Sequence, residues 1–178
     1  MAKISSKQPV LKPQDLYVLL ALLSRGGGSV GYPELAEQTG LAVSAVHAAL
    51  KRAAAAQLAM FQDRRPVVLK TQLREFLLYG AKYAFPPVWG SLTRGVPTAY
   101  AVAPLNKVIS PSADPVPVWP HPKGEVRGVG LAPLYPSVPA AALKDERLYA
   151  MLALFDALRS GQARERNVAQ KLLEEFFQ

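Results

Sequence analysis

The chain has 178 residues, half of them hydrophobic, and carries a net charge of +8 without any cysteine. This length and this balance of residues indicate a globular chain of one or two domains with a buried core. The lack of cysteine excludes disulfides, thiolate chemistry and cysteine-bound zinc, and it is typical of a reducing compartment. The longest apolar run, 16–23, is eight residues long, whereas a membrane-spanning helix needs about 20. We therefore expect a soluble, cytoplasmic protein that has no membrane partner.

The excess of positive charge belongs to the first half of the chain. Residues 1–83 contain 11 Lys+Arg and 5 Asp+Glu, whereas residues 140–178 contain 6 of each. A basic domain attracts polyanions through the release of counterions, so the charge favours a nucleic-acid partner. The alternative is a mildly basic protein without a specific polyanion partner.

Proline divides the chain into three regions. Residues 84–139 hold 12 of the 16 prolines and both tryptophans. Proline excludes a helix interior, so this region is expected to be extended or irregular, and its tryptophans indicate an ordered connector that packs on the rest of the fold. Residues 10–83 before it and 140–178 after it show helical patterns.

Residues 10–83 predict a compact series of helices followed by a hairpin. Leu16, Leu19, Leu20 and Leu23 have the spacing of a helix, and Gly40 has the position of a left-handed cap that ends the next one. The expected helices are 13–24, 33–39, 43–57 and 72–83, and the expected strands are 58–61 and 67–69 around a turn at 62–66. Gly26–Gly28 predicts a flexible turn, and Ser29-Val30 could form a short strand.

The run from Glu34 to Arg52 resembles the core of bacterial winged helix-turn-helix regulators, broadly of the MarR type. It has Leu35-Ala36 in the second helix, Gly40-Leu41 at the turn, Val46 in the third helix and Leu50-Lys51-Arg52 near its end. The resemblance covers about residues 10–83. It implies a DNA-binding transcription regulator, a repressor that acts as a dimer, with 43–57 as the recognition helix in the major groove and 58–69 as the wing.

The resemblance also identifies candidate DNA-binding residues. Ser44, His47 and Lys51 share one face of helix 43–57, where the first two could reach base edges and Lys51 and Arg52 would hold phosphates. Two arginines at the wing tip suit phosphate or minor-groove contact. The full set is Ser44, His47, Lys51, Arg52, Arg64, Arg65 and Lys70.

Each of these residues also has an ordinary interpretation as a solvated surface side chain. The neighbouring positions on helix 43–57 are apolar, namely Ala42, Val43, Ala45 and Ala48. Such a face could contact thymine methyl groups or pack against protein, so we expect phosphate contacts to supply most of the affinity for DNA.

Two helices, about 141–159 and 163–177, are predicted at the end of the chain. Their apolar residues could form a dimer or partner interface, or they could pack on the protein's own first half. The candidate interface residues are Leu148, Met151, Leu152, Phe155, Leu172, Phe176 and Phe177.

The sequence gives little support to an enzyme. Its two histidines, His47 and His121, share no metal-ligand spacing with carboxylates, so we predict no catalytic residues, no metal and no cofactor. The rival function is a protein-binding winged-helix adaptor or antitoxin-like protein, whose alanine-rich third helix and Pro/Trp-rich middle would bind a protein partner. The predicted fold is mainly α with a small β-hairpin: a winged helix-turn-helix (10–83), a proline-rich connector (84–139) and a C-terminal helix pair (140–178).

Overall fold

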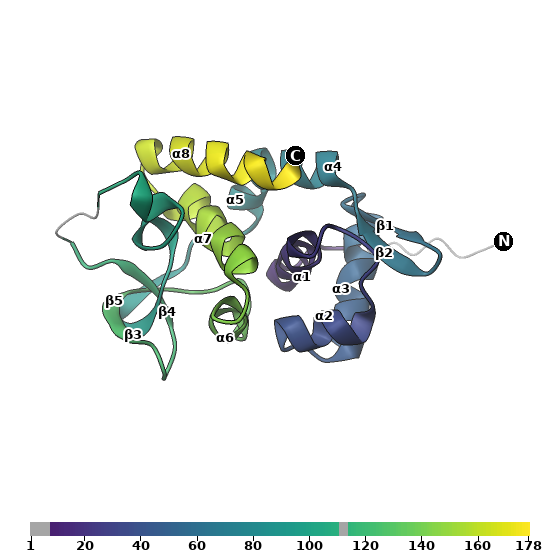
Figure 1. Ribbon diagram of the computed structural model, residues 1–178, viewed down its shortest axis with the longest axis horizontal. Helices are drawn as coiled ribbons and strands as arrows, with labels where there is room; N and C mark the ends of the chain where they lie inside the picture. The colour runs from purple at the N-terminus through teal and green to yellow at the C-terminus, as the bar shows by residue number, and fades with distance from the viewer. Residues whose placement is uncertain (1–7, 111–113) are drawn as a thin grey trace.

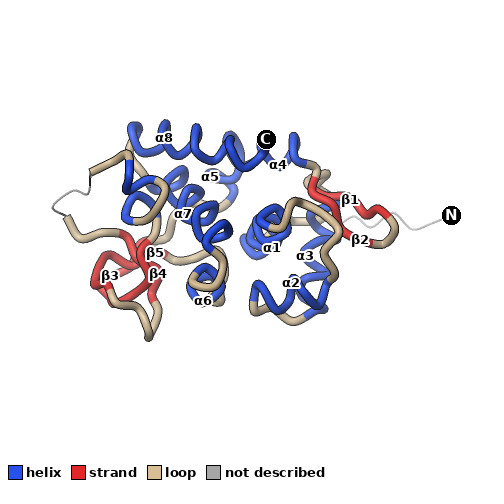
Figure 2. The backbone as a smooth tube through the Cα atoms, in the orientation of Figure 1, coloured by secondary structure: helices blue, strands red, loops and turns tan. Residues whose placement is uncertain are grey.

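The computed structural model describes residues 8–110 and 114–178. The described chain is mostly helical, with a two-stranded antiparallel hairpin and a separate sheet of three strands (Figures 1 and 2). The sheet and the hairpin lie at opposite ends of the molecule, and helices fill the space between them (Figure 2). None of the helices in the described ranges combines the length and apolar character needed to span a bilayer.

The helices and hairpin expected in the first half are present. They are α1 (Pro13–Ser24), α2 (Tyr32–Thr39), α3 (Val43–Ala55), β1 (Ala59–Gln62) and β2 (Arg65–Val68). Pro13 starts α1 at a position where its missing N–H is not needed, and Gly40 ends α2 with a left-handed φ of 70°. The hairpin turn is tighter than the expected 62–66, because Asp63 and Arg64 alone form it, both with positive φ. The short strand considered at 29–30 does not form.

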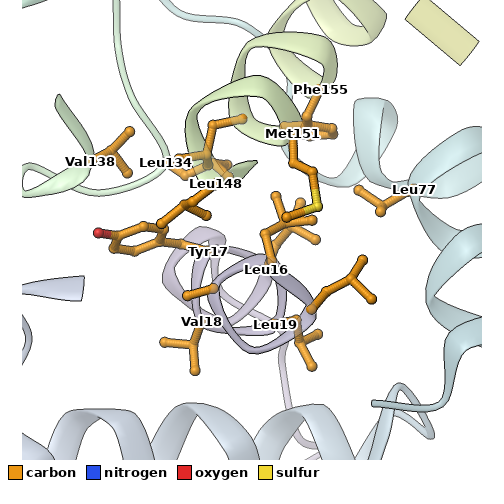
Figure 3. Packing of buried hydrophobic residues seen from close by; sticks show 14 of the residues in the cluster. Leu16, Tyr17, Val18, Leu19, Leu77, Leu134, Val138, Leu148, Met151 and Phe155 are labelled. Atoms are coloured by element: carbon orange, nitrogen blue, oxygen red, sulfur yellow. The ribbon is translucent and has the colours of Figure 1, made fainter. Parts of the chain in front are cut away.

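Helix α1 lies at the centre of the core. Its residues from Asp15 to Leu23 are all at most 1 % exposed. Figure 3 shows Leu16 and Tyr17 on the side of α1 that faces α7 (Glu146–Ser160), whereas Val18 and Leu19 lie on the opposite side. A helix that is apolar on all sides must be covered on all sides. One continuous core therefore joins the two halves of the chain.

The helix expected at 72–83 is longer and interrupted. It comprises α4 (Lys70–Glu75), a π-helical turn (Phe76–Gly80) and α5 (Ala81–Ala84). A Cβ at Gly80 would lie 3.0 Å from Cδ2 of Phe76, so the glycine leaves room for that ring. Arg74 of α4 forms an ion pair of 2.9 Å with Glu174, which connects this helix to the end of the chain.

The described parts of the proline-rich region, 84–110 and 114–139, contain a sheet that the sequence interpretation missed. Strands β3 (Trp89–Pro97), β4 (Pro117–Pro120) and β5 (Val126–Leu131) close on themselves, with β3 antiparallel to both partners and β4 parallel to β5. Such a small closed sheet leaves little space between its strands, and the fully buried Val118 side chain lies next to Gly95 and Gly128. A Cβ at Gly95 would collide with the carbonyl oxygen of Trp119, and one at Gly128 with that of Val116. Short 3-10 turns, Ala99–Ala101 and Leu105–Lys107, follow β3.

The last part of the chain is helical, with one break more than expected. The predicted helix 141–159 is divided into α6 (Val138–Ala142) and α7, because Asp145 caps α7 by accepting a hydrogen bond from the Leu148 amide at 2.9 Å. The final helix is α8 (Ala163–Glu174), followed by a 3-10 turn (Glu175–Phe177). Helix α7 lies between α1 and the three-stranded sheet (Figure 1).

The burial of α7 corrects the expected dimer or partner interface. Leu148, Met151, Leu152 and Phe155 are at most 2 % exposed inside the protein's own core. They would have to leave that core to meet another chain. Leu172, Phe176 and Phe177 are half-buried and pack against the same core. The open alternative, that these helices pack on their own first half, is the arrangement in the structure.

Candidate nucleic-acid interface

The turn between α2 and α3 is fixed by hydrogen bonds from side chains of other elements. The carbonyl oxygen of Thr39, the last residue of α2, accepts hydrogen bonds from the Tyr17 hydroxyl at 2.9 Å and the Ser137 hydroxyl at 2.5 Å. Burial raises the pKa of Tyr17 well above its ordinary value, so its hydroxyl remains a donor. The turn that sets the angle between the two helices is therefore held by α1 and by the segment before α6.

Helix α3 presents one face to the core and one to the outside. Its buried residues are Val46, Ala49, Leu50 and Ala53. Ser44 and Lys51 are exposed, and Val43 beside them keeps 48 % of its surface exposed. The outer face is thus mainly small and apolar, with Lys51 as its cation.

His47 lies on the same face but is half-buried. Its ring stands edge-on to Tyr32, the first residue of α2, with 5.1 Å between the ring centroids and 77° between the planes. This packing restricts the imidazole, so His47 is less free than Ser44 or Lys51 to reach toward a ligand.

Arg52 has a different role from the expected phosphate contact. Its guanidinium forms two hydrogen bonds with the Asp15 carboxylate, Nη2 to Oδ1 at 2.7 Å and Nε to Oδ2 at 2.8 Å. These bonds raise the pKa of Arg52. Because Asp15 is fully buried in α1, the arginine supplies the counter-charge that the core requires. The sequence does hold a signal for this pair, since Asp15 is the only charged residue within 13–24.

The hairpin tip carries the two expected arginines in different settings. Arg64 is exposed in the turn itself, with φ 63°. Arg65 begins β2, and its Nη1 donates to the carbonyl oxygen of Ser29 at 3.0 Å. Met60 and Phe61 of β1 are 45 % and 39 % exposed, which the sequence interpretation did not anticipate. The hairpin therefore offers cations next to apolar side chains.

The glycine-rich loop after α1 lies against the hairpin. The carbonyl oxygen of Gly27 accepts a hydrogen bond from the Val68 amide at 2.7 Å. A Cβ at Gly27 would lie 3.7 Å from Cε of Lys70, so the exposed Lys70 side chain runs over this loop. Positive φ at Gly26, Gly27 and Ser29 gives the loop its shape. Local pattern alone did not indicate this long-range pairing.

Four of the seven expected DNA-binding residues are thus exposed cations. Within residues 8–110 and 114–178 the ion pairs are Arg52–Asp15, Arg74–Glu174 and Arg159–Asp156. Lys51, Arg64, Arg65 and Lys70 take part in none of them, and they come from α3, the hairpin and α4. Their charges are available to an anionic ligand.

A second buried carboxylate, Asp156, lies elsewhere and is fully engaged. Asp156 of α7 accepts hydrogen bonds from Thr98 Oγ1 at 2.7 Å, Trp119 Nε1 at 2.6 Å and Arg159 Nε at 2.8 Å. Burial raises the pKa of Asp156, and the Arg159 charge opposes this. Arg159 also donates to the carbonyl oxygen of Ala132 at 2.7 Å. This cluster attaches the three-stranded sheet to α7.

Comparison with known proteins finds no matching family model, no matching curated protein and no matching solved structure.

Proposed function

We propose that residues 10–83 form a winged helix-turn-helix that binds double-stranded DNA, and that the protein is a transcription regulator, as the sequence resemblance implies. In this proposal α3 enters the major groove, the β1–β2 hairpin is the wing, and Lys70 contacts the backbone. The single observation that carries the proposal is a set of four exposed cations that form no ion pair with any described residue. They are Lys51, Arg64, Arg65 and Lys70, and they lie on adjoining elements at one end of the molecule (Figure 1).

The chemistry of α3 limits what this interface reads. Ser44 is the exposed hydrogen-bonding residue on its first turn, and Val43 next to it fits thymine methyl groups better than polar base edges. Arg52 is excluded from the interface because it neutralises Asp15. Phosphate contacts therefore supply most of the affinity, and sequence preference is modest.

A repressor that binds as a dimer would need an interface outside α7. The four α7 residues of the expected interface are inside the core, so two copies would associate through surfaces that leave this core intact. Light scattering on the intact chain, with and without DNA, measures the assembly directly.

The test is the salt dependence of binding to random-sequence duplex DNA and to the DNA upstream of the gene. Each neutralised phosphate contributes about −0.9 to the slope of log K against log salt. We therefore expect the double variant Arg64→Ala with Arg65→Ala to make this negative slope shallower by about two on every sequence. Fluorescence anisotropy with labelled duplex measures both affinity and slope.

A matched variant separates a defined interface from general charge attraction. Lys107→Ala with Arg164→Ala removes the same charge from two exposed residues, in the turn after β3 and at the start of α8. We expect it to leave the slope unchanged. Equal effects of the two double variants, or a wing variant with the wild-type slope, would contradict the proposed wing.

A further inference from the structure

The three-stranded sheet lies at the end of the molecule away from the hairpin (Figure 1), and one of its faces carries large exposed side chains. Leu92 lies opposite Val129 and Arg94 opposite Arg127 in the β3–β5 register, so these four side chains share a face. Trp89 pairs with Leu131, and a register shift separates this pair from Leu92 and Val129. Because of this shift, Trp89 lies on the same face of the sheet as these four side chains. We call Trp89, Leu92, Arg94, Arg127 and Val129 the β3–β5 face.

The two arginines of this face are an unfavourable pair within the protein. Like charges that lie directly opposite each other on neighbouring strands destabilise a sheet. Both arginines are exposed, and within the described part of the chain neither guanidinium has an ion pair or a side-chain hydrogen bond. The Asp156 cluster holds the sheet on α7. The two charges therefore remain side by side, complementary to a pair of anionic groups.

The apolar residues beside them decide which class of anion fits. Trp89 is 49 % and Leu92 is 53 % exposed, and Val129, which is paired with Leu92, is half-buried. Tryptophan and arginine are enriched among residues that dominate protein–protein binding energy. A single-stranded nucleic acid would use several aromatic rings for stacking, and this face has one ring beside aliphatic side chains. A protein segment with carboxylates and apolar side chains matches both components.

We propose that the β3–β5 face binds an acidic segment of a partner protein, with the partner's carboxylates on Arg94 and Arg127 and its apolar side chains on Trp89 and Leu92. The charge complementarity of the arginine pair identifies the occupant. This binding is separate from the DNA interface, because it uses none of α3, the hairpin or α4. The sequence analysis considered a protein-binding function through the third helix. The β3–β5 face would serve that function in place of α3.

In the experiment, a displayed library of random peptides is selected for binding to the full-length protein. The affinity of individual selected peptides is then measured by fluorescence anisotropy. We expect the selected peptides to be rich in Asp, Glu and large apolar residues. Arg94→Gln with Arg127→Gln should weaken them about tenfold or more, as loss of well-placed charge contacts does. Leu92→Gln should also weaken them, and its exposed position makes it the variant that tests the apolar component without disturbing the core. Lys107→Gln with Arg164→Gln, the charge-matched control, should bind like the wild type.

Each outcome decides the matter. Acidic peptides that lose affinity in both β3–β5 variants support the proposal. Absence of enriched peptides, or peptides that bind the arginine variant and the control equally, overturns it. Labelled oligo(dT) that binds the wild type and loses affinity in the same arginine variant would also overturn it, in favour of a nucleic-acid surface. No duplex DNA enters this experiment, so its result does not depend on the proposed DNA binding.

Discussion

Replacing Arg52 by methionine should destabilise the protein and leave its affinity for DNA unchanged. The substitution keeps an aliphatic stem but removes the guanidinium that faces Asp15, whose side chain is 0 % exposed. Breaking a buried ion pair by removing one partner costs about 3–5 kcal/mol. We expect the lower end, about 3 kcal/mol, because the Arg52 side chain is 21 % exposed and water can reach the gap. Asp15 also keeps the hydrogen bond from the Lys12 amide at 2.9 Å.

The assay compares this variant with its neighbour in the sequence. For a chain of this length, 3 kcal/mol corresponds to a fall in Tm of about 10 °C. Lys51→Met should show the opposite result, an unchanged Tm and weaker DNA binding, because Lys51 is exposed and has no ion pair among the described residues. Adding Asp15→Asn to Arg52→Met removes the stranded charge and should restore much of the loss. An Arg52→Met protein with the wild-type Tm but weakened DNA binding would refute the structural role.

Two further predictions concern the second half of the chain. Asp156→Ala should lower the free energy of unfolding by about 3–5 kcal/mol in a urea titration, because it leaves a buried Arg159 without its partner. Glu174→Ala, at the half-exposed pair with Arg74, should lower it by at most about 1 kcal/mol. Equal losses in the two variants would show that burial does not set the contribution of these ion pairs. Burial raises the pKa of Tyr149 from 10.0 to about 12, so the folded state retains a proton that the unfolded chain loses, and stability should fall as the pH rises from about 10 to about 12. Tyr149→Phe should have a flatter pH dependence of stability over this window, and an identical slope would remove Tyr149 as its source.

The sequence predicted the parts of the fold that depend on neighbouring residues. Helix α1 has the expected bounds, and α2 and α3 begin and end within two residues of the prediction. Their proline starts, apolar spacing and the glycine at position 40 act over a few residues. The hairpin was also predicted, although its turn is shorter than expected and consists of Asp63 and Arg64 alone.

Features that join distant residues could not be predicted in this way. Proline masked the strands at 89–97, 117–120 and 126–131, and their closure depends on glycines that face another strand's backbone. The Arg52–Asp15 pair spans 37 residues, so the pattern of helix α3 by itself favoured a phosphate contact. The apolar residues of α7 indicated that this helix must be covered. They did not indicate that α1 is the element that covers it.

Helix α7 packs against α1 (Figure 3), and α1 belongs to the region that resembles a winged helix-turn-helix. Because α1 is buried on all sides, the region that resembles a winged helix-turn-helix is completed by a helix that lies outside it. Asp145 reinforces this contact, since its Oδ2 accepts hydrogen bonds from Gln38 Nε2 at 2.8 Å and from Ser24 Oγ at 3.2 Å while Oδ1 caps α7. The α2–α3 turn likewise depends on Ser137. Residues 10–83 therefore share one core with the C-terminal helices, and the proposed DNA interface is positioned by residues from both halves of the chain.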